Sequence, residues 1–403
     1  MRDTPERKRR KGKTVKVHIG VTAHNYTDWE RVRAGDFSRG PTVSDSSHVE
    51  RAFAIGDLAE PLGYDGIWVP DHFGTPYCLT PNPIQTLTWF AARTERIEFG
   101  TMVLVLPWYH PIQLAHQIAY LDIASKGRFT TIGLGRGVAR SEYDSLGIDR
   151  NDASERFREC VDVLELALTT ERFSYNGKHF QIPDSSLRPQ PITKDLPTRF
   201  YGASATNSSL EYLARRGIKP MGVGNKAIDD LAKDVVLFNQ FRAEEGMAPA
   251  RPRTVLYMCC SNDPEKIREA HGYSVIANQA VSLHYNFDDP ASFKGVKGYE
   301  AYSKFEATGG GDDERAYNRS SMLIGTPDEI IEKILYAHEQ CGFDEIGLHS
   351  AHGGMPFEDA KASMTLFAQE VLPVLHKLTP APLRLPEPEM ANSEAERSPF
   401  VPG

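Results

Sequence analysis

Short apolar runs alternate with longer amphipathic segments along most of the chain. The runs are rich in β-branched residues, whereas the segments between them repeat apolar residues every three or four positions, as helices do. Eight runs are predicted to be strands, and they cover residues 15–22, 66–69, 97–106, 129–134, 198–201, 218–223, 254–259 and 344–349. Strands that alternate with helices build parallel sheets. The pattern therefore predicts an α/β fold, a TIM (β/α)8 barrel with long inserted loops.

The predicted helices follow these strands along the chain. They occupy residues 47–62, 111–125, 153–170, 207–216, 227–245, 264–277, 327–340 and 357–375. In the last helix Met364, Phe367, Val371 and Leu375 recur at steps of three and four, so one stripe is expected to pack on the barrel.

Three of the predicted loops are long, at residues 24–46, 173–196 and 278–321, and the third contains the glycine run 309–311. Barrel enzymes carry their chemistry on the loops that follow the carboxyl ends of the strands. Loops of this length are commonly lids, so we expect them to shape the substrate pocket.

The two ends of the chain differ in composition from its body. Basic residues concentrate in the first 16 residues, although the 403-residue chain has a net charge of −8. From residue 379 onward, prolines and acidic residues replace the apolar period. We predict a disordered head (1–13), a barrel domain (14–378) and a disordered tail (379–403).

Composition also excludes several classes of protein. Beyond the basic head the chain is acidic, which disfavours binding to the negatively charged backbone of a nucleic acid. No apolar run is long enough to cross a membrane. The odd number of cysteines, without a Cys-x-x-Cys pair, fits neither a disulfide framework nor a zinc site. These cysteines are Cys78, Cys160, Cys259, Cys260 and Cys341. They indicate a reducing compartment, and we predict a cytoplasmic protein.

Two neighbouring strand ends carry residues suited to a phosphate group. Arg136 lies in the glycine-rich run 132–137, and its guanidinium is a forked donor. After the strand 198–201, small and hydroxylated residues from Ala203 lead into a helix, whose first N–H groups attract anions. Ser204 and Asn207 are the candidates there. A tight glycine turn and ordinary helix capping are the alternative interpretations.

Asp71, His72 and His110 follow two other strands and could transfer protons. A helix cap for Asp71 and a buried, hydrogen-bonded ring for His72 are the structural alternatives. Four histidines at strand ends, His24, His72, His110 and His349, also raise the question of a metal. Without a His-x-His pair after the first strand, or a lysine placed to bridge metals, we predict no metal site.

The order of the motifs resembles the bacterial luciferase-like, flavin-dependent monooxygenase family. The similar stretches are LGYDGIWVPDHF, IEFGTMVLVLPWYHPIQLAHQIAYLDIASKGRF, IGLGRGVARSEYDSLGI and FYGASATNSS, followed by GTPDEIIEKI and FAQEVLPVL. Any one stretch is unspecific, but their order is specific and spans most of the chain.

The resemblance implies a barrel that binds reduced FMN at the carboxyl ends of the strands. Its cofactor-binding residues would be Met102, Val103, Arg136, Tyr143, Arg156, Ala203, Ser204 and Asn207. Arg136, Ser204 and Asn207 would hold the phosphate, and a cis peptide between Met102 and Val103 would lie under the flavin ring. His72 and His110 match family histidines near the ring. Asp71 departs from the luciferase itself, which has a histidine there, so the resemblance does not extend to light emission or aldehyde oxidation.

We therefore predict a monooxygenase that uses reduced FMN and O2, through a C4a-hydroperoxide, to oxygenate a small organic substrate. Asp71, His72 and His110 are its predicted catalytic residues, and Phe73, Trp108 and His352 are expected to contact substrate. Since no GxGxxG motif opens a βαβ unit, a separate NAD(P)H:flavin reductase should supply the reduced FMN. The resemblance also implies a homodimer.

Three alternatives stay open at this point. One is an F420-dependent oxidoreductase of the same fold, and another is a flavin-binding protein without catalysis. The third is a metal-dependent barrel hydrolase. The reduced cofactor that binds, the reaction with oxygen and the metal content would distinguish them.

Overall fold

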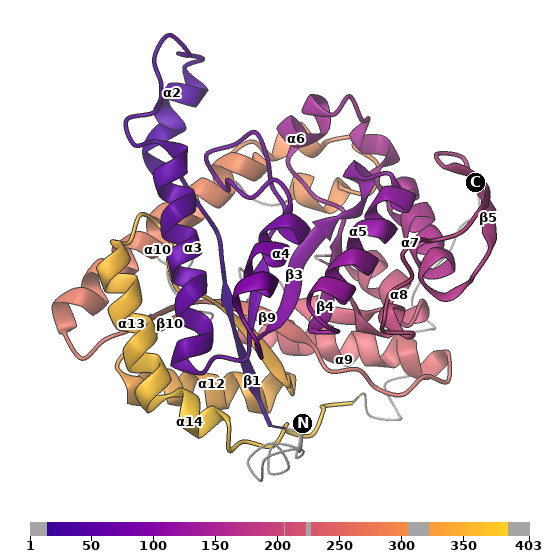
Figure 1. The fold of residues 1–403 in the computed structure, drawn as a ribbon. Helices are drawn as coiled ribbons and strands as arrows, with labels where there is room; N and C mark the ends of the chain where they lie inside the picture. The colour runs from indigo at the N-terminus through magenta and orange to yellow at the C-terminus, as the bar shows by residue number, and fades with distance from the viewer. Residues whose placement is uncertain (1–13, 205, 223–226, 305–321, 386–403) are drawn as a thin grey trace.

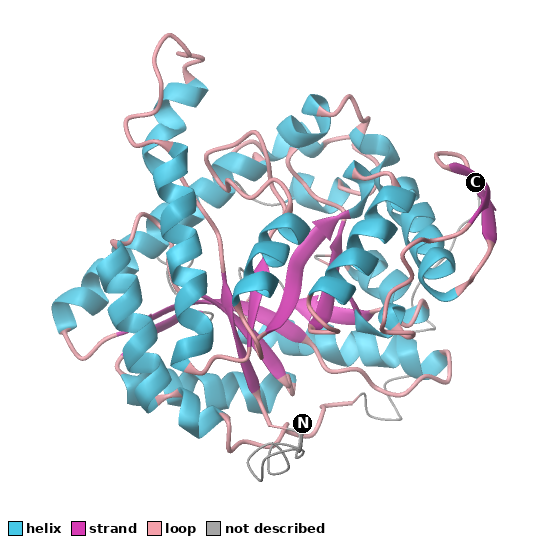
Figure 2. Ribbon diagram, viewed as in Figure 1, coloured by secondary structure: helices cyan, strands magenta, loops and turns pink. Residues whose placement is uncertain are grey.

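Eight parallel strands close into a barrel, and helices surround it (Figures 1 and 2). The computed structural model describes residues 14–204, 206–222, 227–304 and 322–385. Around the ring the strands are β1 (Lys16–Gly20), β2 (Gly66–Val69), β3 (Glu98–Val105), β4 (Phe129–Gly135), β7 (Phe200–Ala203), β8 (Lys219–Gly222), β9 (Arg253–Cys260) and β11 (Glu345–His349). β8 pairs with β9 and β11 pairs with β1, which closes the ring. The predicted TIM barrel is confirmed, and each predicted strand supplies one strand of the ring.

Three further strands lie outside the ring and were not predicted. β10 (Met322–Gly325) pairs with the second half of β9. β5 (Phe173–Asn176) and β6 (Gln181–Ser185) form an antiparallel hairpin at the right edge of Figure 1, inside the segment 173–196 that was predicted as a loop. The hairpin forms because Phe173, Phe180 and Ile182 bury their side chains against the barrel's main hydrophobic core.

Each predicted helix is present in the structure, with α13 and α14 together in place of the last one, and further helices lie between them. They are α2 (Trp29–Arg33), α3 (Asp45–Leu62), α4 (Pro83–Arg93), α5 (Pro111–Ala124), α6 (Arg140–Ser145), α7 (Ala153–Thr169), α8 (Asn207–Arg215), α9 (Ile228–Glu244), α10 (Pro264–Tyr285), α12 (Pro327–Cys341), α13 (Phe357–Glu370) and α14 (Leu372–Leu375). α2, α4 and α6 had not been predicted, and α2 lies in the segment 24–46 that was predicted as a loop. α10 runs eight residues beyond its predicted end, because Ala277, Ala280 and His284 continue its buried stripe.

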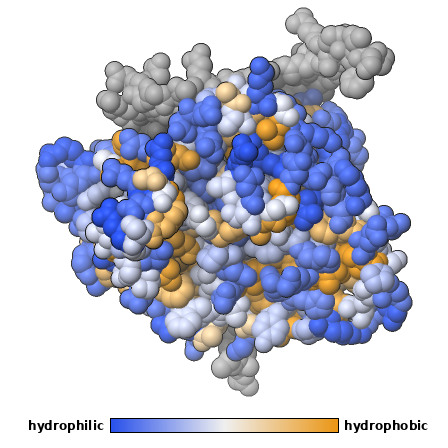
Figure 3. All heavy atoms as spheres, turned by 90° about the horizontal axis from the view of Figure 1, so that it is seen from above, coloured by the Kyte–Doolittle hydropathy of each residue, from blue (hydrophilic) through white to orange (hydrophobic). Residues whose placement is uncertain are grey.

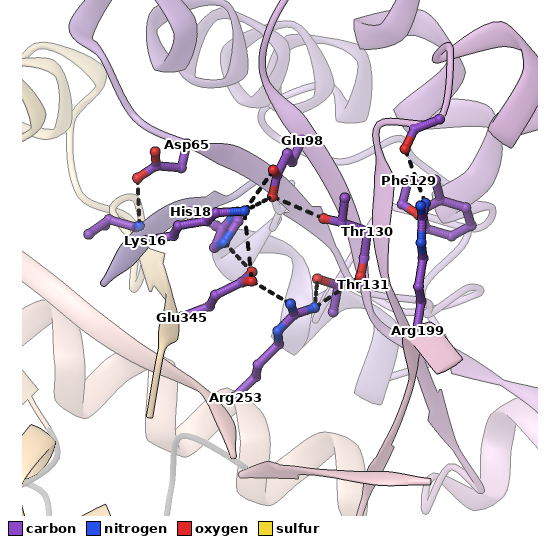
Figure 4. Close-up of polar contacts among 12 residues, drawn as sticks. Lys16, His18, Asp65, Glu98, Phe129, Thr130, Thr131, Arg199, Arg253 and Glu345 are labelled. Atoms are coloured by element: carbon purple, nitrogen blue, oxygen red, sulfur yellow. Dashed lines mark hydrogen bonds and ion pairs between the residues drawn. The ribbon is translucent and has the colours of Figure 1, made fainter. Parts of the chain in front are cut away.

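A network of charged side chains fills the amino-terminal end of the barrel (Figure 4). The Lys16 ammonium donates to the Glu98 carboxylate at 2.7 Å. His18 Nε2 lies 2.8 Å from Glu345 Oε2, and the Arg253 guanidinium donates to the other oxygen of Glu345. Four of these residues open a strand, so the barrel presents them to one another at the same end. The chemistry of TIM barrels lies at the other end, so we assign this network to stability.

The long segments after the strands contribute short helices near the carboxyl end of the barrel. The first contains η1 (Tyr26–Asp28) and α2, and the segment after α10 contains η5 (Pro290–Phe293) and η6 (Glu300–Lys304). The predicted glycine run 309–311, the head (1–13) and residues 386–403 of the tail lie outside the described residues. Residues 379–385 are described, and the Ala381 carbonyl accepts a hydrogen bond from Arg251. Of the described helices, none has the length and apolar character to span a membrane.

Candidate functional site

The carboxyl ends of the strands face upward in Figure 1, and Figure 3 views that face from above. Hydrophilic residues cover most of the visible surface, and apolar residues are exposed in smaller patches between them. Beneath this surface lie two groups of buried polar side chains and, at the end of β4, the guanidinium of Arg136. Most of these side chains belong to residues that the sequence predicted for the site.

Asp71 lies just beyond the end of β2 and is 2% exposed. Its Oδ2 accepts hydrogen bonds from the Val105 amide at 3.0 Å and the Tyr109 hydroxyl at 2.8 Å. Oδ1 has no hydrogen-bond partner among the described residues. Burial raises the pKa of Asp71 to about 7, because the two hydrogen bonds compensate only part of the desolvation of the ion. A carboxyl group in this state can donate a proton near neutral pH.

His72 is held between two elements that sequence reasoning did not connect with it. Its Nδ1 lies 3.0 Å from Glu142 Oε1 on α6, and its Nε2 lies 3.3 Å from the Tyr285 hydroxyl at the end of α10. Glu142 Oε2 in turn lies 3.3 Å from Nε2 of His284. Burial alone would raise the pKa of Glu142, but the two histidines lower it to about 2. The carboxylate is therefore ionised.

The cluster of His72, Glu142 and His284 also contains the ligand types of a transition-metal site. Its three ligand atoms lie within 4.8 Å of one another. Two other groups have ligand atoms equally close together: His18, Glu98 and Glu345, and Asp152, Glu155 and His179. In the first, Lys16 and Arg253 already pair with the carboxylates. In the second, Lys178 and Lys297 pair with Glu155. Of the three groups, the cluster around Glu142 is therefore the one whose carboxylate is not paired with a lysine or arginine.

Phe73 and Trp108, both predicted to contact substrate, lie against each other beside His72. The ring centroids of Phe73 and Trp108 are 5.1 Å apart, and Trp108 lies 6.4 Å from the His72 ring. Trp108 Nε1 is buried and has no hydrogen-bond partner among the described residues. An apolar wall with one free donor thus borders the catalytic candidates.

The peptide bond between Met102 and Val103, in β3, is cis, as the resemblance implies. The side chain of Val103 packs on β4, where a Cβ at Gly135 would lie only 2.4 Å from Val103 Cγ2. Glycine at this position lets the two strands approach closely. The end of the Met102 side chain lies near Gly20 on β1, where an added Cβ would be 3.1 Å from Met102 Cε.

Arg136 follows β4 and keeps its charge free of carboxylates. Its guanidinium donates to Ser154 Oγ at 2.7 Å and to the Gly298 carbonyl at 3.0 Å, and it lies over the Tyr299 ring. No described carboxylate lies within 4.0 Å of it. A cation without an ion-pair partner of this kind suits a phosphate group.

The second half of the predicted phosphate cradle lies at the start of α8. Ala203 ends β7, Ser204 follows it with its hydroxyl donating to the Thr206 carbonyl, and Asn207 is the first residue of the helix. Thr206, not Asn207, is the helix cap, since its side chain accepts from the Ser209 amide. The side chain of Asn207 is therefore not required for capping.

The remaining cofactor and catalytic candidates have structural contacts. Tyr143 is fully buried and donates to the Arg136 carbonyl, which holds the glycine-rich run in place. Arg156 donates to the Pro107 carbonyl at 2.9 Å and lies over the Phe180 ring. His110 is exposed and contacts the edge of that same ring. No described contact joins Arg156 or His110 to Asp71 or His72.

Three neutral histidines form a second buried group, on the side of β1 and β11. Burial lowers the pKa of His24 and His352 to about 4 and that of His349 to about 3. His349 stacks on Tyr257, and His352 meets the edge of the same ring. His352 is 2% exposed, and both its ring nitrogens lack hydrogen-bond partners among the described residues. Polar atoms in this state are available to a ligand.

Sequence reasoning missed Glu142, His284 and Tyr285. Glu142 was part of the quoted motif, but nothing in its local pattern indicates that it faces His72. His284 and Tyr285 fall in the segment predicted as a loop, so their helical placement was not foreseen.

Comparison with known proteins identifies the class of this fold and site. A family model described as luciferase-like monooxygenase matches residues 35–345, so the chain belongs to that family. The resemblance predicted from the motifs is confirmed.

Similar proteins include the oxygenase component of a flavin-dependent trigonelline monooxygenase from Acinetobacter baylyi. It is 28% identical over 333 residues, which are 78% of this chain and 87% of that protein. An alkanal monooxygenase alpha chain from Photobacterium leiognathi is 26% identical over 347 residues, with 83% and 96% covered.

Solved structures share the fold. A monooxygenase from Streptomyces bottropensis superposes with a TM-score of 0.73 at 24% identity and covers 89% of this chain and 99% of its own. An F420-dependent secondary alcohol dehydrogenase reaches 0.66 at 16% identity, with 90% and 99% covered. At these identities the likeness shows the fold alone.

Proposed function

We propose that this protein is the oxygenase component of a two-component monooxygenase, which uses reduced FMN and O2 to oxygenate a small organic substrate. The proposal rests mainly on one observation. A buried carboxyl group with a raised pKa, Asp71, lies beside a carboxylate-bound histidine, His72, at the barrel end that also presents the unpaired cation Arg136. Membership of the luciferase-like monooxygenase family supports it.

The residues at this end fit a flavin mononucleotide. Arg136, Ser204 and Asn207 would hold its phosphate, and Met102 and Val103 would lie beneath its ring. When bound in its reduced form, the flavin supplies the electrons that activate O2. The C4a-hydroperoxide route anticipated from the sequence stays a prediction.

The chain's own residues would manage protons and water. Asp71, whose pKa is about 7, would donate a proton through Oδ1, the oxygen without a partner among the described residues. His72 would accept one at Nε2. Phe73 and Trp108 would exclude water from the reacting atoms, because their rings pack together beside His72.

The substrate would lie between these rings and His352. Trp108 Nε1 and both ring nitrogens of His352 are buried without a hydrogen-bond partner among the described residues, so they would be available to bond the substrate. Because one relative is named for trigonelline, an N-methylated aromatic acid, compounds of that type belong in the first substrate panel along with neutral aromatics and terpenes. A separate NAD(P)H:flavin reductase would supply the reduced FMN.

Anaerobic titration with reduced FMN, reduced F420 and reduced riboflavin tests the cofactor. We expect FMN to bind more tightly than riboflavin, since only FMN carries the phosphate that Arg136 would bind. Turnover under 18O2 then tests the reaction, and the label should appear in the product. Tight binding of F420 with no label in any product would instead indicate hydride transfer without oxygen.

A further inference from the structure

His72, Glu142 and His284 form a continuous polar cluster between α6, α10 and the end of β2. The side chains of Glu142 and His284 are almost completely buried, and that of His72 nearly so. The contacts on the two sides of the carboxylate are 3.0 Å from His72 Nδ1 and 3.3 Å from His284 Nε2. The main-chain amide of Phe73 also donates to Glu142 Oε1, at 3.1 Å. Glu142 is thus surrounded by groups that can donate.

These contacts fix the tautomer of His72. An ionised carboxylate can only accept hydrogen bonds, so the ring nitrogen that faces it must carry the proton. That nitrogen is Nδ1. The other nitrogen, Nε2, faces the Tyr285 hydroxyl at 3.3 Å. Burial raises the pKa of Tyr285 well above its usual value, so the hydroxyl keeps its proton and can donate it to Nε2.

The same reasoning fixes the tautomer of His284. The Thr75 hydroxyl oxygen accepts from the Tyr77 amide at 3.1 Å, which leaves its proton free to point at His284 Nδ1, 3.2 Å away. Nδ1 is then the acceptor and Nε2 carries the proton, 3.3 Å from Glu142 Oε2 but without hydrogen-bond geometry. Burial lowers the pKa of His284, which favours this neutral form. Glu142 Oε1 is therefore hydrogen-bonded to His72 Nδ1, and Oε2 lies at ion-pair distance, 3.3 Å, from His284 Nε2.

We propose that Glu142 and His284 are positioning residues that hold His72 as its Nδ1–H tautomer, with Nε2 as the proton-accepting atom at the mouth of the barrel. A carboxylate that orients a catalytic histidine in this way is a general device of acid–base catalysis. Glu142 holds the proton on Nδ1, and His284 fixes the carboxylate from its far side. The inference rests on the proposed function for the role of His72, but the tautomer itself does not depend on it.

Other titratable groups face the cluster from each neighbouring element. They are Asp71 after β2, Tyr77 and Cys78 in the following loop, His24 after β1, Tyr143 on α6 and Tyr285 on α10. The test therefore reads the tautomer of His72 directly rather than through a pH profile alone.

The imidazole 15N chemical shifts of the full chain, labelled at its histidines, report the tautomer without flavin or substrate. The His72 signals are assigned as those lost in His72→Gln. We expect a protonated Nδ1 and an unprotonated Nε2. In Glu142→Gln the uncharged amide no longer enforces this state, so the signals should move toward a mixture of tautomers. Asp65→Asn is the matched control, because it alters a His–carboxylate contact of 2.7 Å with His376, away from the site.

Turnover is the second measurement. Two variants at position 284 provide it even if Glu142→Gln does not fold. His284→Leu removes the N–H that faces Glu142, and we expect kcat to fall about tenfold or more with KM changed less than about twofold. His284→Gln restores an N–H in that direction and should recover most of the loss. A role in packing alone would favour leucine over glutamine.

Three results would overturn the inference. They are a protonated Nε2 on His72 in the unmodified protein, variants at 142 and 284 that leave both the 15N signals and kcat unchanged, and a stoichiometric divalent metal removed by a chelator. The last would assign the cluster as a metal site. If the tautomer is as inferred but no substrate is oxygenated, the proposed function fails and the positioning of His72 stands.

Discussion

Replacing Asp71 with asparagine removes a buried ionisable group whose effect on the free energy of unfolding depends on pH. The pKa of Asp71 rises from 3.8 to about 7 on folding, because burial disfavours the ion. The native state therefore binds more protons than the unfolded state between these two values, and the free energy of unfolding falls as the pH rises through this window. At 1.36 kcal/mol per pKa unit, the loss between pH 5 and pH 8 is roughly 2–3 kcal/mol.

Asparagine keeps an oxygen that can accept from the Val105 amide and the Tyr109 hydroxyl, as Asp71 Oδ2 does. Its amide nitrogen takes the place of Oδ1, which has no described partner, at a cost of about 1–3 kcal/mol that does not change with pH. Only the change in the free energy of unfolding between the two pH values therefore reports the ionisation of Asp71. Relative to the unmodified protein, Asp71→Asn should gain roughly 2–3 kcal/mol between pH 5 and pH 8.

Urea unfolding followed by tryptophan fluorescence at both pH values measures this quantity. Glu60→Gln is a suitable control, because burial is outweighed there by hydrogen bonds from main-chain amides such as that of Arg96, which lower the pKa of Glu60. Its effect on stability should be the same at pH 5 and pH 8. If Asp71→Asn also showed a constant difference, Asp71 would be ionised in the folded protein at no cost, and its role as proton donor would be lost.

Three further substitutions test other parts of the molecule. Arg136→Met should weaken FMN binding by about tenfold or more, measured by titration, and leave riboflavin binding unchanged, because only FMN carries the phosphate. Glu345→Gln should destabilise the fold by about 3–5 kcal/mol in urea titration without changing FMN affinity, since it leaves the buried Arg253 unpaired at the opposite end of the barrel. Burial lowers the pKa of His352 to about 4, so its contribution to stability is complete above pH 6.5 and is lost, by roughly 3 kcal/mol, as the pH falls toward 4. Unfolding measured between pH 4 and pH 6.5 should therefore show no such loss of stability in His352→Gln. If the variant kept the pH dependence of the unmodified protein, the His352 ring would not be buried as a neutral group.

The barrel could be predicted from sequence because each of its strands is a local pattern. Runs such as Ile67 to Val69 are fully buried, so their apolar character is visible without knowledge of the partners. The hairpin of β5 and β6 is different, because only alternate residues such as Phe173 and Ile182 reach the core. The end of α10 was missed because only Ala280 and His284 are buried beyond residue 277, so the sequence there shows little apolar period.

The candidate site was predictable only in part, for a related reason. Asp71, His72 and Arg136 stand at strand ends, and all strand ends of a barrel meet at one face. Glu142 and His284 are 70 and 212 residues away from His72 along the chain, and only the folded structure brings the three side chains together. The contact between α10 and the end of β2 depends on helix length, which the sequence pattern did not define.

The most direct test of the proposed function follows the reaction of the reduced protein–FMN complex with oxygen. The protein is loaded anaerobically with reduced FMN and mixed with O2, and the absorbance is followed by stopped flow. We expect the band of oxidised flavin to appear only after a delay that is much longer than for free reduced FMN. With substrate present, the delay should be shorter and product should form. Immediate oxidation at the rate of free flavin would contradict the proposed function.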